Sequence, residues 1–120
     1  MYTIKKQKKE ATKMAAININ YEEFKSIISN NEKPVLVDFW APWCVYCRRI
    51  ASAYEKIAEQ YEDKVIVAKV NIDENQKLAE QEAIEVIPTL VLYKNGKAVD
   101  SIVAPESKAK IEGFINQYID

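Results

Sequence analysis

The sequence predicts an α/β domain in which helices flank a central mixed β-sheet, and three observations support this. Short apolar runs rich in Val and Ile alternate with segments whose apolar residues recur at helical spacing. Asn95-Gly96 lies between two apolar runs and is a strong signal for an antiparallel hairpin. Hydrophobic residues make up 48% of a chain of 120 residues, enough for one domain with a core that needs no disulfide staples.

Two strand–helix units make up the first half of the predicted domain. Asn20 and Glu23 stand three residues apart in a capping-box pattern, which predicts the start of a helix. The next strand is apolar almost throughout, as in a strand covered on both faces, and the long helix after it has a single apolar stripe. In order, these elements are a strand at 16–19, a helix at 20–31, a strand at 34–40 and a helix at 44–61.

In the second half of the domain, the sequence predicts one more strand covered on both faces, a short polar helix, the hairpin and a final helix. The final helix begins at Ser107, a favoured N-cap residue, and carries a buried face of apolar residues at helical spacing. The predicted elements are a strand at 64–71, a helix at 75–82, strands at 89–93 and 97–103, and a helix at 107–118.

The sequence predicts a flexible basic tail at residues 1–15, followed by one domain at residues 16–120. The first 13 residues carry five lysines and one glutamate, a net charge of +4. The net charge of the whole chain is -1, so the remaining 107 residues have a net charge of -5. A nucleic-acid arm and a solvated tail both fit this composition, and we expect the solvated tail. No apolar run follows the basic residues, so we expect no secretory signal and a cytoplasmic protein.

The composition excludes several classes of function. The chain has no histidine, which excludes His-based catalytic triads, imidazole acid–base chemistry and ordinary catalytic zinc sites. Its net charge of -1 excludes a generally acidic or basic binder, and no apolar stretch approaches the roughly 18 residues of a membrane span. We therefore expect no metal, no nucleic-acid partner and no membrane partner.

Cys44 and Cys47 are the only cysteines, and they lie where a predicted strand gives way to a helix. Two cysteines are too few for a disulfide scaffold and supply half of a zinc site, unless two chains share the metal. Two buried cysteines without a function are a further alternative, but the spacing favours redox chemistry. The helix N-terminus favours a thiolate at Cys44, and side chains three apart on a helix suit a disulfide. We therefore expect Cys44 to attack a substrate disulfide and Cys47 to resolve the mixed disulfide.

Four segments make the chain closely similar to the thioredoxin family over about residues 17–119. In family order and spacing, they are Val37-Asp-Phe-Trp-Ala-Pro-Trp-Cys-Val-Tyr-Cys47, Val67-Ala-Lys-Val-Asn-Ile-Asp73, Ile87-Pro-Thr89 and Asn95-Gly96. The resemblance implies a thioredoxin fold and a dithiol/disulfide site that reduces protein disulfides, with electrons from a flavoprotein thioredoxin reductase. It implies no cofactor beyond the dithiol, and we expect a monomer.

The resemblance also implies two supporting catalytic residues. Asp38 is a carboxylate within an apolar strand, where burial raises its pKa toward neutrality. It matches the family's buried aspartate, which helps to deprotonate the resolving cysteine. Lys69 matches the family's lysine paired with that aspartate. The alternatives are a half-exposed strand carboxylate and an ordinary solvated lysine.

The expected substrate-binding residues surround the cysteines. Ile87-Pro88 matches the family's cis-proline loop, whose backbone pairs with an extended substrate segment. Trp43 is expected to form an apolar wall beside the attacking cysteine. Val86 and Ala104 flank the substrate groove at positions where the family often has glycine, so we expect a more crowded and apolar groove. Ala83 also stands where the family often has glycine, but it does not border the groove. The predicted substrate-binding residues are Trp43, Tyr46, Val86, Ile87, Pro88 and Ala104.

Val45-Tyr46 stands between the cysteines, where the familiar dipeptide of the family is Gly-Pro. Proline has no N–H, whereas Tyr46 has one near the Cys44 sulfur. An extra donor would stabilise the thiolate, and hence the reduced form. We therefore predict a reduction potential less negative, by tens of millivolts, than the value of about -270 mV for thioredoxin. The crowded groove also puts recognition by a standard thioredoxin reductase in doubt.

Two alternatives to a disulfide reductase stay open at this point. One is a thioredoxin-like oxidant or disulfide isomerase of an oxidising compartment, although such relatives usually carry histidine between the cysteines. The other is a redox-silent binding module, against which the intact Cys44, Cys47 and Asp38 argue.

Overall fold

The computed structural model describes residues 15–29 and 32–119. Most of the predicted N-terminal tail and the last two positions of the first predicted helix lie outside these ranges. Within them, the predicted fold class is confirmed, and every predicted strand and helix is present. The elements are β1 (Ile17–Asn18), α2 (Tyr21–Ser29), β2 (Val35–Trp40), α3 (Val45–Gln60), β3 (Ile66–Asn71), α4 (Gln76–Gln81), β4 (Thr89–Lys94), β5 (Lys97–Val103) and α5 (Lys108–Asn116).

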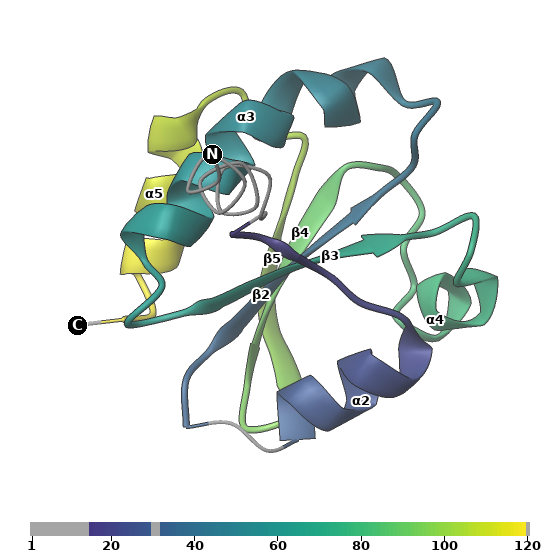
Figure 1. Ribbon diagram of the computed structural model, residues 1–120, viewed down its shortest axis with the longest axis horizontal. Helices are drawn as coiled ribbons and strands as arrows, with labels where there is room; N and C mark the ends of the chain where they lie inside the picture. The colour runs from purple at the N-terminus through teal and green to yellow at the C-terminus, as the bar shows by residue number, and fades with distance from the viewer. Residues whose placement is uncertain (1–14, 30–31, 120) are drawn as a thin grey trace, which may run out of the picture.

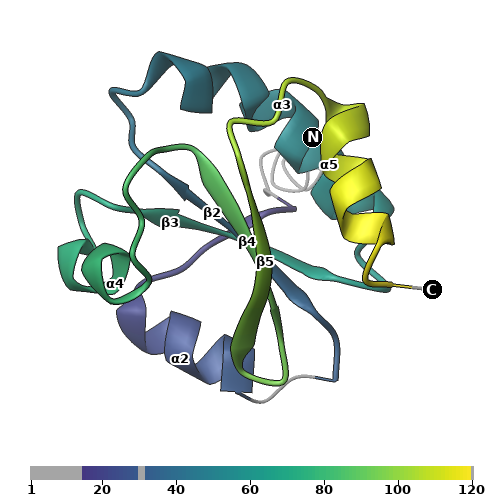
Figure 2. The ribbon, with the colours of Figure 1, turned by 180° about the vertical axis from the view of Figure 1, so that it is seen from behind.

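The five strands form one mixed sheet in the order β1-β3-β2-β4-β5. The β1–β3 and β2–β3 pairs are parallel, whereas the β2–β4 and β4–β5 pairs are antiparallel. Helices α3 and α5 cover one face of the sheet and α2 and α4 cover the other, as Figure 1 and the reverse view in Figure 2 show. None of the helices in the described ranges combines the length and apolar character needed to cross a membrane.

Local sequence signals account for the ends of several elements. Asn20 and Glu23 form the predicted capping box, in which each side-chain oxygen accepts the other residue's backbone N–H at 2.9 Å. Asn95 and Gly96 both have positive φ, 55° and 81°, as the tight turn between β4 and β5 requires. Ser107 caps α5 by accepting the Lys110 N–H at 3.2 Å.

Strand β2 lies at the centre of the sheet and separates two apolar clusters. Side chains alternate between the two faces of a strand. Phe39 packs with the cluster under α2 and α4, whereas Leu36 packs with the cluster under α3 and α5. Asp38 and Trp40 follow Leu36 at intervals of two residues, so their side chains lie on the face that α3 covers. The strand therefore directs a carboxylate toward the helix that carries the cysteines.

Helix α4 ends in a Schellman motif that is built on an unfavourable residue. The Ile84 N–H bonds to the Ala79 carbonyl at 2.9 Å, and the Ala83 N–H bonds to the Glu80 carbonyl at 3.1 Å. Ala83 occupies the left-handed position of this motif with φ 58°, where glycine is the usual residue. A left-handed conformation costs an L-residue about 1–2 kcal/mol.

Replacing Ala83 by Gly should therefore stabilise the protein. Relief of the left-handed strain exceeds the unfolded-state entropy that glycine adds, about 0.4–1 kcal/mol. We expect the free energy of unfolding in urea to rise by up to about 1 kcal/mol. Ala109→Gly, at an exposed position within α5, is the matched control and should lower it by about 0.5–1 kcal/mol. Equal losses in both variants would contradict the prediction.

Candidate active site

The two cysteines lie at the N-terminus of α3 and form a disulfide with their Cα atoms 5.2 Å apart. Cys44 is the N-cap residue, and its Sγ accepts the backbone N–H of Cys47 at 3.1 Å. Together with the positive end of the helix dipole, this donor would stabilise a thiolate at Cys44. Among the described residues, the hydrogen bond to this sulfur comes from Cys47 and not, as the sequence suggested, from the Tyr46 N–H.

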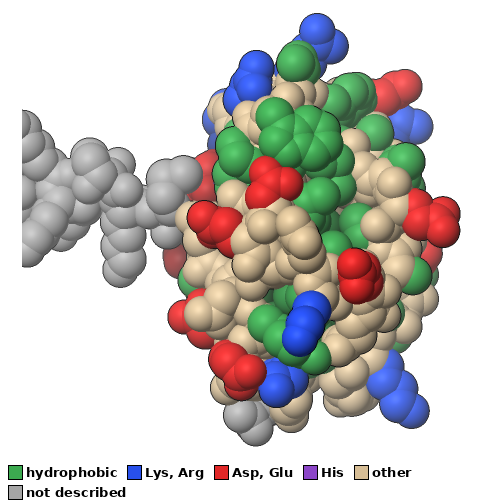
Figure 3. Space-filling model, turned by 90° about the vertical axis from the view of Figure 1, so that its right-hand side faces the viewer, with side chains coloured by type: hydrophobic (Ala, Val, Ile, Leu, Met, Phe, Trp, Pro, Cys, Tyr) green, Lys and Arg blue, Asp and Glu red, His purple; other side chains and the backbone are tan. Residues whose placement is uncertain are grey.

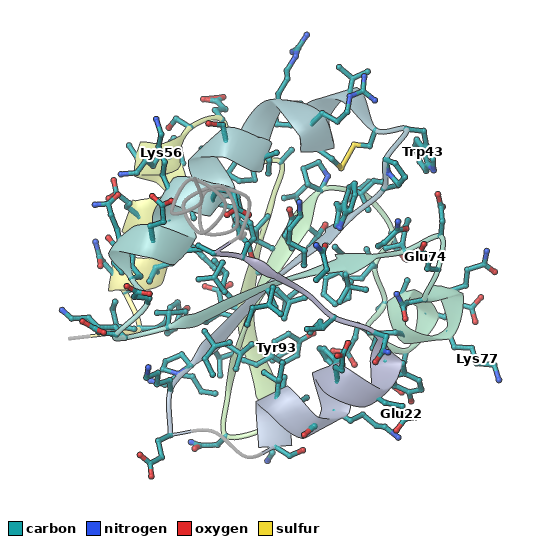
Figure 4. The ribbon with its side chains drawn as sticks, viewed as in Figure 1. Glu22, Trp43, Lys56, Glu74, Lys77 and Tyr93 are labelled. Carbon is teal, nitrogen blue, oxygen red and sulfur yellow. A yellow bond between two sulfur atoms is a disulfide. The ribbon has the colours of Figure 1, made fainter. Side chains whose placement is uncertain are left out.

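Both cysteine side chains are largely enclosed. Cys44 is 8% exposed and Cys47 is 3% exposed. Cys44 is therefore the more exposed of the two residues, as expected for the attacking cysteine. Figure 4 shows the disulfide at the first turn of α3, on the same side of the molecule as Trp43. Trp43 is 63% exposed, and its indole N–H donates to the Asp73 carboxylate at 3.0 and 3.2 Å, which fixes the ring beside the site.

Asp38 is buried in β2, as the sequence predicted. Only 1% of the residue is exposed, and burial raises the pKa of its carboxyl from 3.8 to about 7, against the opposing charge of Lys69. The Oδ1 atom is buried and has no hydrogen-bond partner. A carboxyl group with an unused oxygen and a pKa near neutrality is suited to exchange protons.

Lys69 lies beside Asp38 in the sheet, since the two residues are register partners of β3 and β2. Its ammonium lies 4.5 Å from the centre of the Trp40 ring. In the described part of the chain, the ion pairs within 4 Å are Lys25–Glu22 and Lys108–Glu112. The expected pairing of Lys69 with Asp38 is therefore an electrostatic influence at a distance and not a direct salt bridge.

The loop before β4 borders the disulfide. The Ile87–Pro88 peptide bond is cis, and the half-buried Ile87 side chain packs against the group formed by Ala41, Cys44 and Cys47. Pro88 is buried, and its carbonyl accepts the Ala104 N–H at 2.8 Å. This bond joins two segments that the sequence predicted beside the groove. Val86 points outward and is 54% exposed.

Tyr46 is half-buried, and its hydroxyl is directed into the protein. It donates to the Ala104 carbonyl at 3.2 Å and to the Pro105 carbonyl at 3.4 Å. The ring packs against the cysteines and also against the core under α3 and α5. This contact places the Tyr46 side chain between the active-site helix and the loop after β5.

An apolar surface surrounds the enclosed sulfurs. Figure 3 views the side of the molecule on which Trp43 lies and shows apolar side chains gathered there, with carboxylate groups at the border. Trp43, Val45 and Val86 are large apolar residues that remain more than half exposed. A surface of this kind is typical of a site that binds another apolar surface.

Of the predicted site residues, the structure packs Tyr46 and Ile87 against the group that contains Cys44 and Cys47, and it adds two residues that sequence reasoning missed. Ile72 packs against the cysteine group, and Asp73 holds the Trp43 indole. Both residues belong to the quoted segment that ends at Asp73, so the similarity to the family contained the only signal for them. Their contacts with the site span about 25 to 30 positions of sequence and have no local signature.

Comparisons with known proteins agree with this geometry. The family model described as Thioredoxin matches residues 15–117. The thioredoxin of Porphyra purpurea is 41% identical over 88% of this chain and 99% of its own length, and that of Haemophilus influenzae is 41% identical over 86% and 96%. The crystal structure of the Malassezia sympodialis thioredoxin Mala s 13 superposes with a TM-score of 0.79 at 35% identity, covering 88% of this chain and 92% of that one.

The matches span nearly the full length of both relatives. The paired cysteines lie within the matched region at disulfide distance. The oxidant, isomerase and redox-silent alternatives gain no support from these relatives. The chain belongs to the thioredoxin family and is a dithiol/disulfide oxidoreductase.

Proposed function

We propose that this protein reduces disulfide bonds of other proteins, with Cys44 attacking and Cys47 resolving. The Cys44 thiolate attacks one sulfur of the substrate disulfide, and the other substrate sulfur leaves as a thiolate and takes up a proton. The Cys47 thiolate then attacks Cys44 Sγ, and the second substrate sulfur leaves in the same way. Two electrons pass to the substrate, and the protein ends as the Cys44–Cys47 disulfide. The observation that carries this proposal is the Cys44 sulfur at the N-terminus of α3 with a backbone N–H donated to it.

Asp38 is the proposed acceptor for the proton of the Cys47 thiol. Its side chain lies on the face of β2 that α3 covers, and Trp40 on the same face packs against the cysteine group. A pKa of about 7 allows the carboxyl to be either charged or neutral near physiological pH. Lys69 acts as a positioning residue whose charge lowers this pKa from a still higher value.

The substrate segment is proposed to bind in extended form beside the disulfide. The backbone of Ile87 would pair with it as a neighbouring strand does, and the side chains of Trp43 and Val86 would cover its apolar residues. Tyr46, Pro88 and Ala104 would form the floor and far wall of this groove.

For the catalytic cycle, we propose a flavoprotein thioredoxin reductase as the electron donor and the cytoplasm as the location. Val86 stands exposed where the family often has glycine, so the fit to a given reductase depends on the extra volume of this side chain. The protein is proposed to act as a monomer.

The reduction potential of the Cys44–Cys47 pair tests the direction of this reaction. We expect a value close to that of thioredoxin, about -270 mV, because the donor to Cys44 Sγ is the Cys47 N–H and not the Tyr46 N–H on which the less negative value was predicted. The helix N-terminus and the Cys47 N–H stabilise the Cys44 thiolate and thereby the reduced form. The protein would be equilibrated with dithiothreitol and glutathione buffers, and insulin reduction would be followed in parallel. A value near -180 mV or above would contradict a reductant and favour an oxidant or isomerase.

A further inference from the structure

We propose that the Tyr46 hydroxyl is a positioning group that holds the loop after β5 in a strained conformation at Ala104 and thereby keeps the substrate groove assembled. This inference rests on the proposed function, because the groove matters only if a protein substrate binds there. Tyr46 lies between the two cysteines, but its side chain takes no part in the thiol–disulfide exchange.

Tyr46 joins the first turn of α3 to a segment almost 60 positions later. Its hydroxyl donates to the Ala104 carbonyl at 3.2 Å and to the Pro105 carbonyl at 3.4 Å. The ring packs beside the cysteines and against the core under α3 and α5, so its direction is fixed at both ends. The hydroxyl therefore faces the loop and does not face a docked substrate.

Ala104 is the residue that needs this support. Its φ of 45° lies in the left-handed region, which an alanine rarely adopts. Both of its backbone polar groups are bonded, since its N–H donates to Pro88 at 2.8 Å and its carbonyl accepts from Tyr46. Strained conformations persist where the surrounding structure over-determines them, and these two bonds restrain the residue on either side of its Cα atom.

The two bonds connect the three segments that border the disulfide. Tyr46 belongs to the cysteine helix, Ala104 to the loop after β5, and Pro88 follows Ile87, which packs against the cysteines. Loss of the hydroxyl would release Ala104 toward negative φ and loosen its bond to Pro88. Substrate binding would then have to order the groove, which weakens binding. The Cys44 sulfur would keep its N–H donor, so its own reactivity would not change.

Tyr46→Phe tests this idea because it keeps the ring and removes only the hydroxyl. We expect KM for insulin to rise about three- to tenfold, the effect of losing one net hydrogen bond, with kcat within about twofold. The reaction of the reduced protein with a small aromatic disulfide should stay within about twofold, since that substrate does not need the groove. Tyr21→Phe is the matched control, because it removes a hydroxyl bond to Gln81 on the opposite face of the sheet and should change neither rate.

The Ala104→Gly background supplies the decisive comparison. Glycine adopts positive φ without strain, so Tyr46→Phe should raise KM less than twofold in this background. An equal rise in both backgrounds, or an unchanged KM in Tyr46→Phe alone, would overturn the inference. A wild-type protein that reduces neither insulin nor the small disulfide would overturn the proposed function itself. A wild type that is active, beside an unaffected Tyr46→Phe, would overturn only the role of the hydroxyl.

Discussion

Replacing Cys44 with Ser should abolish the reduction of protein disulfides. A serine hydroxyl stays protonated at neutral pH, whereas a cysteine at this position forms the thiolate that attacks sulfur. We expect insulin reduction to fall at least about a thousandfold, to the level of the uncatalysed reaction with dithiothreitol. The loss would not reflect a damaged helix, because serine is a favoured N-cap residue and Cys44 occupies the N-cap of α3.

Cys47→Ser is the matched variant that separates the two roles. It leaves the attacking sulfur in place and removes the one that resolves the mixed disulfide. Mixed with a substrate disulfide, this variant should accumulate a covalent adduct that non-reducing electrophoresis detects and that dithiothreitol releases. Cys44→Ser should form no such adduct. The reverse pattern would exchange the assigned roles, and a wild type that reduces no disulfide would restore the redox-silent module as the better hypothesis.

The elements that the sequence predicted most closely are those fixed by local interactions. The Asn20–Glu23 capping box and the Asn95-Gly96 turn each depend on residues one to three positions apart, so their sequence signal is complete. The burial of Asp38 was predictable for a related reason. It lies in an apolar run, and the pattern of a doubly covered strand extends to every residue within it.

Contacts between distant side chains were not predictable in the same way. The bond from Tyr46 to the Ala104 carbonyl and the position of the Lys69 ammonium over Trp40 depend on how separate elements pack. The left-handed φ of Ala104 runs against the preference of alanine, so propensity would have predicted the opposite. The only hint was comparative, because the family often places glycine at this position. Sequence reasoning therefore located the site and not its supporting contacts.

Asp38→Asn should make the protein more stable, and increasingly so as the pH rises. The carboxyl has a pKa of about 7 when buried and 3.8 as its ordinary value. Between about pH 4 and pH 7 the folded protein holds a proton that the unfolded chain releases, so the free energy of unfolding falls with rising pH. Three pKa units correspond to about 4 kcal/mol of lost stability above pH 7. Asparagine has no charge to bury, so the oxidised variant should exceed wild type by about 3–4 kcal/mol at pH 8 and match it near pH 4.

Urea unfolding of the oxidised protein at several pH values would measure this difference. Asp63→Asn, at an exposed position between α3 and β3, is the control and should follow the wild-type curve. A difference between Asp38→Asn and wild type that stays constant from pH 4 to pH 8 would show that the change acts through packing and not through the buried charge.

The kinetics of Asp38→Asn test whether the destabilising carboxylate in the core serves catalysis. If Asp38 accepts the proton of Cys47, Asp38→Asn should prolong the mixed disulfide and lower kcat by about 10²-fold near pH 7, the usual effect of removing a general base. Initial attack by Cys44 should change little, because its sulfur is stabilised by the helix N-terminus and the Cys47 N–H. A gain in stability together with slow resolution would mean that the protein retains a destabilising buried carboxylate because it transfers a proton. A gain in stability at unchanged kcat would remove Asp38 from the catalytic mechanism and leave Cys47 to ionise by itself.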